Sequence, residues 1–297
     1  METLRAKSVA LDELGDDGPP VTEGANDRFL WFKASLVAGL VIALYARVLS
    51  DLALDWWIDP GSSHGMLIPP IAIYIAWLRR RSTLATPPSA DARGLWLTLL
   101  ACLMLLVGIL GAEFFLTRTS FVVLLAGLIW TFWGLPRFKT LLFPIVLLCT
   151  MIPLPQIIYN LLAAPLQLFA SQVATDLVQS LGVTVYRDGN VIHLAGISLG
   201  VAEACSGLRS LTSLVTAALL VGFLQCTRIR TRVLLVSLSV PIAIGMNVVR
   251  VAGTALIAEQ NQQYALGYYH LFSGWLVFLA GFGIVGAASA LLHRWMD

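Results

Sequence analysis

The chain has 297 residues, of which 58% are hydrophobic and 12% are charged, and its mean hydropathy is +0.82. Soluble domains typically carry about twice that share of charged residues, so this composition excludes an ordinary soluble domain and indicates a polytopic membrane protein. The formal net charge is +2, and no cluster of Lys and Arg is large enough to indicate binding to nucleic acid.

The first 28 residues differ from the rest of the chain. Residues 1–27 hold seven acidic and two basic side chains, and they include the turn-forming run Gly-Asp-Asp-Gly-Pro-Pro at 15–20. A secretory signal peptide needs a basic start, a short apolar stretch and a cleavage site between small residues, and this segment lacks that pattern. We expect residues 1–28 to form a disordered tail and residues 29–297 to form one transmembrane domain.

Eight apolar segments approach the length of about 20 residues that a helix needs to cross a bilayer. The second is short and opens with Pro69-Pro70, and the fifth is short and contains Pro144 and Pro153. The sequence therefore predicts an all-α polytopic membrane protein with about eight transmembrane helices. Their expected positions are residues 29–49, 66–79, 94–112, 119–135, 138–154, 207–226, 233–257 and 272–292.

Loop charges predict the orientation of these helices, because Lys and Arg concentrate in short cytoplasmic loops. The opposite loops hold only Arg118 and Arg187, so both termini, including the 1–28 tail, are predicted to be cytoplasmic and the 155–206 loop to face outward. The basic residues on the cytoplasmic side are Arg79, Arg80, Arg81, Arg93, Arg137, Lys139, Arg228, Arg230, Arg232 and Arg294.

The outer loop 155–206, between the fifth and sixth helices, has elements of its own. Apolar positions from Ile157 to Leu181 recur with helical spacing, which indicates an amphipathic helix. This helix either lies in the membrane interface or packs on the helix bundle, and the sequence fits both interpretations. Two β-prone runs then flank Asp188-Gly189, which is typical of a β-hairpin turn. A third short β-prone run, 197–201, follows and precedes Glu203 and Cys205.

The stretch Glu203-Ala-Cys-Ser-Gly-Leu-Arg-Ser210 is polar although it opens an apolar segment. It holds Cys205, a candidate nucleophile, and Glu203, Ser206 and Arg209 are candidate supporting or substrate-binding residues; Glu203 and Arg209 either pair with each other or bind substrate. The other cysteines, Cys102, Cys149 and Cys226, lie in apolar surroundings, where a cysteine is usually a small filler. No CxxC spacing is present, so neither a disulfide framework nor a metal site is predicted.

The predicted helix directions bring three reactive residue types to the outer half of the membrane. The sixth helix starts near Cys205, the seventh carries Arg250 toward its outer end, and the eighth starts after His270. Arg250 lies about 13 Å along a helix from Glu259. An arginine at that depth costs at least a few kcal/mol unless it faces a partner or water. The alternative is that its guanidinium extends to the interface.

Two further candidates lie at the same level. His64 precedes the second helix, and Asn247 lies one turn before Arg250 on the same helix face, where it can orient the guanidinium. Each histidine also has a structural interpretation: His270 follows two tyrosines and suits an interfacial position, and His64 and His193 fit structural roles.

A cysteine, a histidine and an arginine together suit nucleophilic catalysis. A free thiol with a pKa near 8.5 is only about 3% thiolate at neutral pH, and a histidine that accepts its proton, beside a cation, activates it. Attack on a carbonyl creates an oxyanion that a fixed guanidinium stabilises. The product is a thioester acyl-enzyme, which water or an amine can resolve.

Several stretches, in order and in spacing, resemble the exosortase/archaeosortase family from about residue 30 to the C-terminus. The stretches are Ser63-His64-Gly65, Ile152-Pro-Leu-Pro155, Arg187-Asp-Gly-Asn190, Val201-Ala-Glu-Ala-Cys-Ser-Gly-Leu-Arg-Ser210, Asn247-Val-Val-Arg250 and His270.

The resemblance implies a membrane-embedded cysteine transpeptidase of the bacterial cytoplasmic (inner) membrane, without metal or organic cofactor, whose catalytic residues match Cys205, Arg250 and His270. Its implied partners are exported, membrane-anchored proteins with a C-terminal sorting signal of the PEP-CTERM type, often in connection with exopolysaccharide production, and its acceptor molecule is not specified. Two alternatives stay open: a membrane cysteine protease that releases its product to water, and a non-enzymatic transporter or scaffold of an exopolysaccharide export system. The sequence shows no matched broken helices of the kind that many transporters contain.

Overall fold

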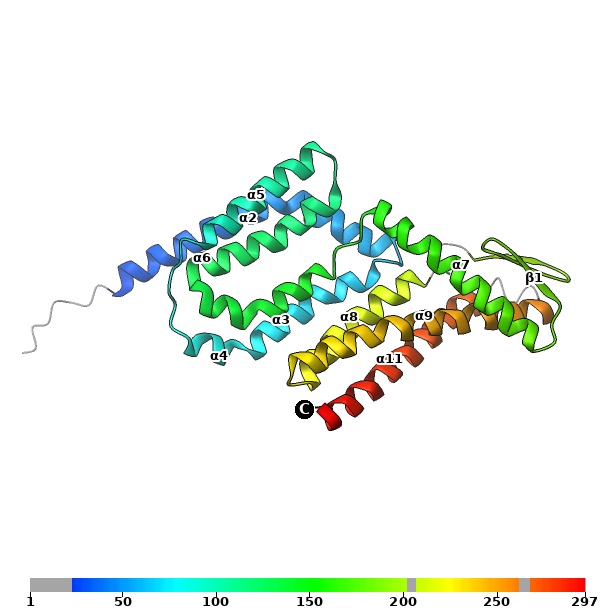
Figure 1. Cartoon of the computed structure of the whole chain (residues 1–297). Helices are drawn as coiled ribbons and strands as arrows, with labels where there is room; N and C mark the ends of the chain where they lie inside the picture. Colours follow the sequence, from blue (N-terminus) through cyan, green and yellow to red (C-terminus); the bar gives the residue numbers. More distant parts are fainter. Residues whose placement is uncertain (1–22, 202–206, 262–267, 297) are drawn as a thin grey trace, which may run out of the picture. The chain divides into compact units, whose positions relative to one another are not determined.

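The structure is a computed structural model, and it describes residues 23–201, 207–261 and 268–296 (Figure 1). The chain forms two compact units, residues 1–49 and 50–297. Helix α2 (Glu23–Ile58) contributes the described part of the first unit and then continues into the second. It begins at Glu23, inside the 1–28 stretch that was expected to be a tail.

The second unit contains the remaining elements. Its 3₁₀ and α-helices are η1 (Ser63–Leu67), α3 (Ile68–Leu78), α4 (Arg80–Ala85), α5 (Gly94–Leu110), α6 (Phe114–Cys149), α7 (Gln156–Ser180), α8 (Leu208–Gln225), α9 (Ile229–Gln260) and α11 (Tyr268–Met296). Its strands are β1 (Val185–Asp188), β2 (Val191–Leu194) and β3 (Ser198–Gly200).

The all-α membrane architecture is confirmed, but the count of eight transmembrane helices is not. In the described part of the chain, six helices are long and apolar enough to cross a membrane: α2, α6, α7, α8, α9 and α11. Helices α3 and α5 are apolar but have only 11 and 17 residues, which is short of the about 20 that a bilayer requires. The count also differs because α7, which was expected either to lie in the membrane interface or to pack on the bundle, is long and apolar enough to be included.

Helix α6 covers the fourth and fifth expected segments and reverses direction within itself. Gly134 has φ 81° and ψ 167°, a conformation that is essentially restricted to glycine, and the two arms on either side of it run in opposite directions (Figure 1). The segment before α5 packs on this reversal: the Ser89 and Asp91 amides donate to the Trp133 and Thr131 carbonyls. The second arm ends at Cys149 rather than at residue 154 because a turn over 150–152 and two prolines follow it.

The hydrophobic core divides into three clusters. One joins the end of α2 with α3 and α6, and includes Leu52, Ile75 and Leu147. A second joins α8, α9 and α11 through Leu214, Leu235 and Val285. The third lies between α7, the sheet and the C-terminal half of α9.

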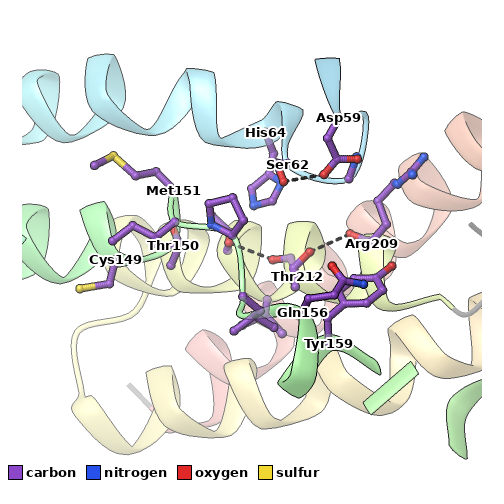
Figure 2. A pocket seen from close by; sticks show the side chains of 16 residues that line it. Asp59, Ser62, His64, Cys149, Thr150, Met151, Gln156, Tyr159, Arg209 and Thr212 are labelled. Carbon is purple, nitrogen blue, oxygen red and sulfur yellow. Dashed lines mark hydrogen bonds between the residues drawn. The ribbon is translucent and has the colours of Figure 1, made fainter. Parts of the chain in front are cut away.

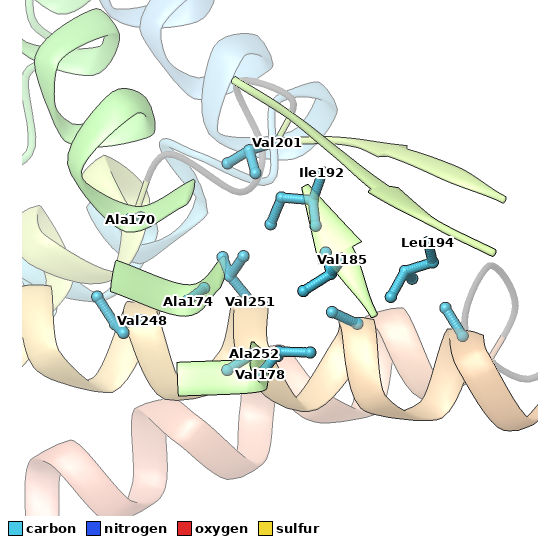
Figure 3. Close-up of a cluster of buried hydrophobic side chains, with 12 residues drawn as sticks. Ala170, Ala174, Val178, Val185, Ile192, Leu194, Val201, Val248, Val251 and Ala252 are labelled. Carbon is cyan, nitrogen blue, oxygen red and sulfur yellow. The ribbon is translucent and has the colours of Figure 1, made fainter. Parts of the chain in front are cut away.

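The third cluster builds a platform of α7 and the sheet on the end of α9 (Figure 3). Small residues of α7, such as Ala174, allow close contact with Ala252 and Ala255 of α9, while Ile192 of the sheet fills the space above them. The helix and the hairpin are therefore confirmed within a residue or two of their expected positions. The packing of α7 on the bundle is confirmed as well, whereas a position in the membrane interface stays a prediction.

The sheet has the order β1-β2-β3 with antiparallel pairing throughout, and Tyr186 pairs with His193 and His193 with Ser198. The turn between β1 and β2 contains Gly189 at φ 60°, as the Asp-Gly signal predicts. Strand β3 ends at Gly200, so the 203–210 octapeptide follows the sheet almost directly in the sequence.

One expected loop arginine is buried. Arg118 was predicted to lie in an outer loop, but it is inside α6, is 7% exposed and forms a 2.6 Å ion pair with Asp55 of α2. This pairing compensates the cost of placing its charge next to the apolar segment.

Candidate functional site

The start of α8 lies directly against α9. Gly207, the residue before α8, has φ 79°, and a β-carbon placed on it would lie 2.6 Å from Cγ of Asn247. Asn247 is 3% exposed. The contact therefore fixes the backbone two residues after Cys205 against the side chain that precedes Arg250 by one helical turn.

Arg250 connects the same place to α11. It is 9% exposed, and its Nη1 lies 3.8 Å from the position that a β-carbon on Gly274 would occupy. Gly274 is one turn after His270, whose backbone belongs to the first turn of α11. Two neighbouring residues of α9 thus contact two other helices: Asn247 lies against the residue before α8, and the Arg250 guanidinium lies near the second turn of α11.

The structure brings together only part of the predicted site. Arg250 and Asn247 are buried neighbours on α9, as their spacing predicts. Cys205, Glu203 and Ser206 lie outside the described residues, and so does the side chain of His270. Arg209 and His64 are described, and both face a separate cavity.

Replacing Gly207 by alanine is expected to destabilise the start of α8. Alanine at φ 79° is strained by about 1–3 kcal/mol, and its β-carbon would overlap Asn247. The midpoint of thermal unfolding of the detergent-solubilised protein should fall by several degrees. Gly245→Ala is the matched control, because a β-carbon there meets nothing within 4 Å. An unchanged midpoint in Gly207→Ala would contradict the observed contact.

A cavity of about 540 Å³ lies beside the first two turns of α8 (Figure 2). Three segments that are distant in the sequence form its walls: the turn before η1, the residues that join α6 to α7, and α8. The polar side chains that line it are Asp59, Ser62, His64, Thr150, Gln156, Tyr159, Arg209, Thr212 and Thr216.

His64 is held in this cavity by η1. The indole Nε1 of Trp56 donates to the Met151 carbonyl at 2.9 Å, and Gly65 packs so closely on Trp56 that no side chain fits there. Desolvation by burial lowers the pKa of His64 below its usual 6.5, and the nearby carbonyls of Thr150 and Gly61 oppose this effect only in part. His64 is therefore predominantly neutral at pH 7. Its Nδ1 is buried without a hydrogen-bond partner among the described residues.

The two charged residues of the cavity differ in their bonding. Both oxygens of Asp59 are engaged: Oδ1 accepts from the Gly61 amide at 2.8 Å and Oδ2 accepts from the Ser62 hydroxyl at 2.7 Å. In contrast, Nε of Arg209 is buried and has no hydrogen-bond acceptor within the described part of the chain. The Asp59 side chain thus stabilises its own turn, and Arg209 keeps a donor for a ligand or water.

The opposite end of α8 carries aromatic and basic groups. Phe223 stacks on Phe143, with 3.6 Å between ring centroids, and the guanidinium groups of Arg79 and Arg232 lie 4.6 and 5.3 Å from its ring. Phe223 and Arg209 are about 21 Å apart along the helix. Two of the predicted cytoplasmic arginines therefore meet at the end of the bundle that is remote from the cavity.

Several cavity residues are not among those predicted from the sequence: Asp59, Gln156, Tyr159, Thr212 and Thr216. The helical spacing of Arg209, Thr212 and Thr216, which places three polar side chains on one face of an apolar helix, is a signal that points to part of this set. Asp59, Gln156 and Tyr159 carry no comparable signal. Among the described side chains, no three His, Cys, Asp or Glu groups lie close enough together to hold a metal ion.

The family comparison covers both parts of the site. The model of the transmembrane exosortase family matches residues 56–287, which include the cavity, the octapeptide and Arg250. No curated protein and no solved structure matches the chain. The match extends over more than half of the sequence and agrees with its apolar helices, and the chain therefore belongs to the transmembrane exosortase family.

Proposed function

We propose that the protein is a membrane-embedded cysteine transpeptidase that cleaves a C-terminal sorting signal of exported proteins. Membership of the exosortase family supports an activity of this type. The single observation that supports the assignment of residues is the buried Arg250, whose Nη1 lies near Gly274 of α11 and which follows Asn247, the contact of Gly207, by one helical turn.

In the proposed reaction, His270 takes the proton of Cys205 and the thiolate attacks the scissile carbonyl. The guanidinium of Arg250 stabilises the resulting oxyanion, and Asn247 positions that guanidinium. The C–N bond then breaks, the leaving amine receives the proton from His270, and the acyl group stays on Cys205 as a thioester. Attack by an acceptor nucleophile releases the product and regenerates the thiol.

The proposed site is at the outer face of the cytoplasmic membrane, with both termini in the cytoplasm. The arginines near Phe223 support this orientation, because basic residues favour the cytoplasmic side and they lie at the far end of α8 from the octapeptide. The exported substrate, anchored by one helix, would then present its signal at the level of Cys205.

The test is co-expression with a tagged substrate, followed by mass spectrometry of its new C-terminus. A transpeptidase yields a C-terminus that carries an added group, and a trapped covalent adduct on Cys205 identifies the intermediate. A free carboxylate would instead assign the protein as a hydrolytic cysteine protease. Absence of cleavage by a correctly inserted protein would remove the proposal in favour of a transporter or scaffold.

A further inference from the structure

We propose that the 540 Å³ cavity beside α8 is the acceptor site of the enzyme. It binds an uncharged group that bears a hydroxyl or an amine, and His64 is the base that takes its proton when it attacks the acyl-enzyme. This inference rests on the proposed function, since it concerns the second half of the same reaction.

The lining of the cavity selects a polar but uncharged ligand. Asp59 and Arg209 contribute opposite charges, so the cavity as a whole favours neither an anion nor a cation. The Gln156 amide and the Tyr159 hydroxyl offer both donors and acceptors. The Thr212 hydroxyl, which donates to the Arg209 carbonyl, offers an acceptor, and this set suits a hydroxyl- or amine-bearing group. The volume is in the range of cavities that hold small-molecule ligands.

His64 is the group in this cavity that is free to accept a proton. The carboxylate of Asp59 is engaged by the Gly61 amide and the Ser62 hydroxyl, and the guanidinium of Arg209 has donors but no acceptor. A neutral imidazole has one nitrogen that donates and one that accepts. Nδ1 of His64 is buried without a hydrogen-bond partner among the described residues, and in the proposal this nitrogen is the base.

The cavity also lies close to the helix that follows Cys205, as attack of an acceptor on the acyl-enzyme requires. Arg209 and Thr212 belong to the first turns of α8, whose opposite side begins at Gly207 against Asn247. The helix that follows Cys205 in the sequence therefore has the cavity beside its first turns, and the residue before it contacts Asn247, one turn from Arg250. This arrangement agrees with two separate bases. His270 acts when Cys205 is acylated, and His64 acts when the acceptor attacks the acyl-enzyme.

The step balances without a further reactant. His64 accepts the proton of the acceptor O–H or N–H, and the lone pair of that atom attacks the thioester carbonyl. The tetrahedral intermediate collapses with cleavage of the C–S bond, so that an ester or amide forms and the Cys205 thiolate leaves. The proton on His64 then returns to the sulfur or to solvent.

The experiment follows the two half-reactions separately with the full chain in lipid nanodiscs, a peptide substrate, and glycerol as the hydroxyl acceptor probe. His64→Gln should form the Cys205 adduct at the wild-type rate but resolve it with glycerol about 100-fold more slowly, because general-base assistance typically contributes about 10²–10⁴-fold. Hydroxylamine, which attacks thioesters without a base, should resolve both adducts equally fast. His193→Gln, on the exposed face of the sheet, is the matched control and should behave as wild type.

Tyr159→Phe removes one cavity hydroxyl and is expected to raise the glycerol concentration for half-maximal resolution without changing adduct formation. It decides the question if His64→Gln does not fold. The inference is overturned if His64→Gln slows adduct formation as much as resolution, if it changes neither, or if Tyr159→Phe leaves the glycerol dependence unaltered. A wild-type protein that forms no adduct on Cys205 would instead refute the proposed function, so the two failures are distinguishable.

Discussion

Replacing Cys205 by alanine should abolish processing of a co-expressed substrate while leaving membrane insertion unchanged. Alanine has no nucleophile, and no other group in the proposed mechanism can form the thioester. Cys205→Ser should be nearly as inactive, because a hydroxyl is far less acidic than a thiol and the site provides a base suited to the thiol. The measurement is the ratio of processed to unprocessed tagged substrate on an immunoblot, with the enzyme level in the membrane fraction determined in parallel.

The remaining cysteines provide controls within the same chain. Cys102 is exposed on α5, and Cys226 is buried at the opposite end of α8, where its sulfur lies 3.7 Å from the Ser289 hydroxyl. Cys102→Ala and Cys226→Ala should both retain processing. Full processing by Cys205→Ala, or its loss in Cys102→Ala, would show that another residue carries the chemistry.

Replacing Arg250 by glutamine should lower the rate of adduct formation on Cys205 by about 10²–10³-fold, the typical effect of removing one oxyanion donor. Arg250→Lys should recover only part of this loss, because the ammonium is a point charge and does not reproduce the planar fork of the guanidinium. Rapid quenching followed by intact-protein mass spectrometry measures the rate of adduct formation directly.

The control for charge is Arg230→Gln, at the exposed N-terminal end of the same helix. It removes the same group without touching the site and should leave the rate of adduct formation unchanged. Equal effects of the two substitutions would mean that Arg250 acts through stability or insertion, so thermal unfolding midpoints are compared for both variants.

The sequence predicts those parts of the fold that depend on local pattern. Three features follow from the spacing of residues within one segment. They are the Asp188-Gly189 turn, the amphipathic helix α7 and the apolar helix α9, which carries Asn247. The number of crossings does not follow, because α3 is short, α6 reverses at Gly134, and α7 has the length and composition of a transmembrane helix. Those features depend on packing partners that composition does not reveal.

The candidate site also has a part that the sequence predicts and a part that it does not. Asn247 and Arg250 share a helix face, so one segment is sufficient to predict their proximity. The cavity around His64 forms only when α8 meets two segments that are about 60 and 150 residues away in the sequence, and its polar side chains come from all three. The spacing of residues along the chain does not show which distant segments contact each other. For that reason the sequence did not identify Tyr159 as a residue of the site.

The length and the packing of helix α9 connect the platform to Arg250. Its 32 residues extend about 48 Å, which exceeds the about 30 Å of bilayer hydrocarbon. The C-terminal part of this helix contacts the platform of α7 and the sheet through Val251 and Ala255, and Arg250 is adjacent to that contact. Because Val251 directly follows Arg250, the packing that holds the platform also sets the position of the guanidinium. A larger side chain at Ala255 is therefore expected to shift Arg250 and to lower the rate of the reaction, although Ala255 lies outside the proposed site.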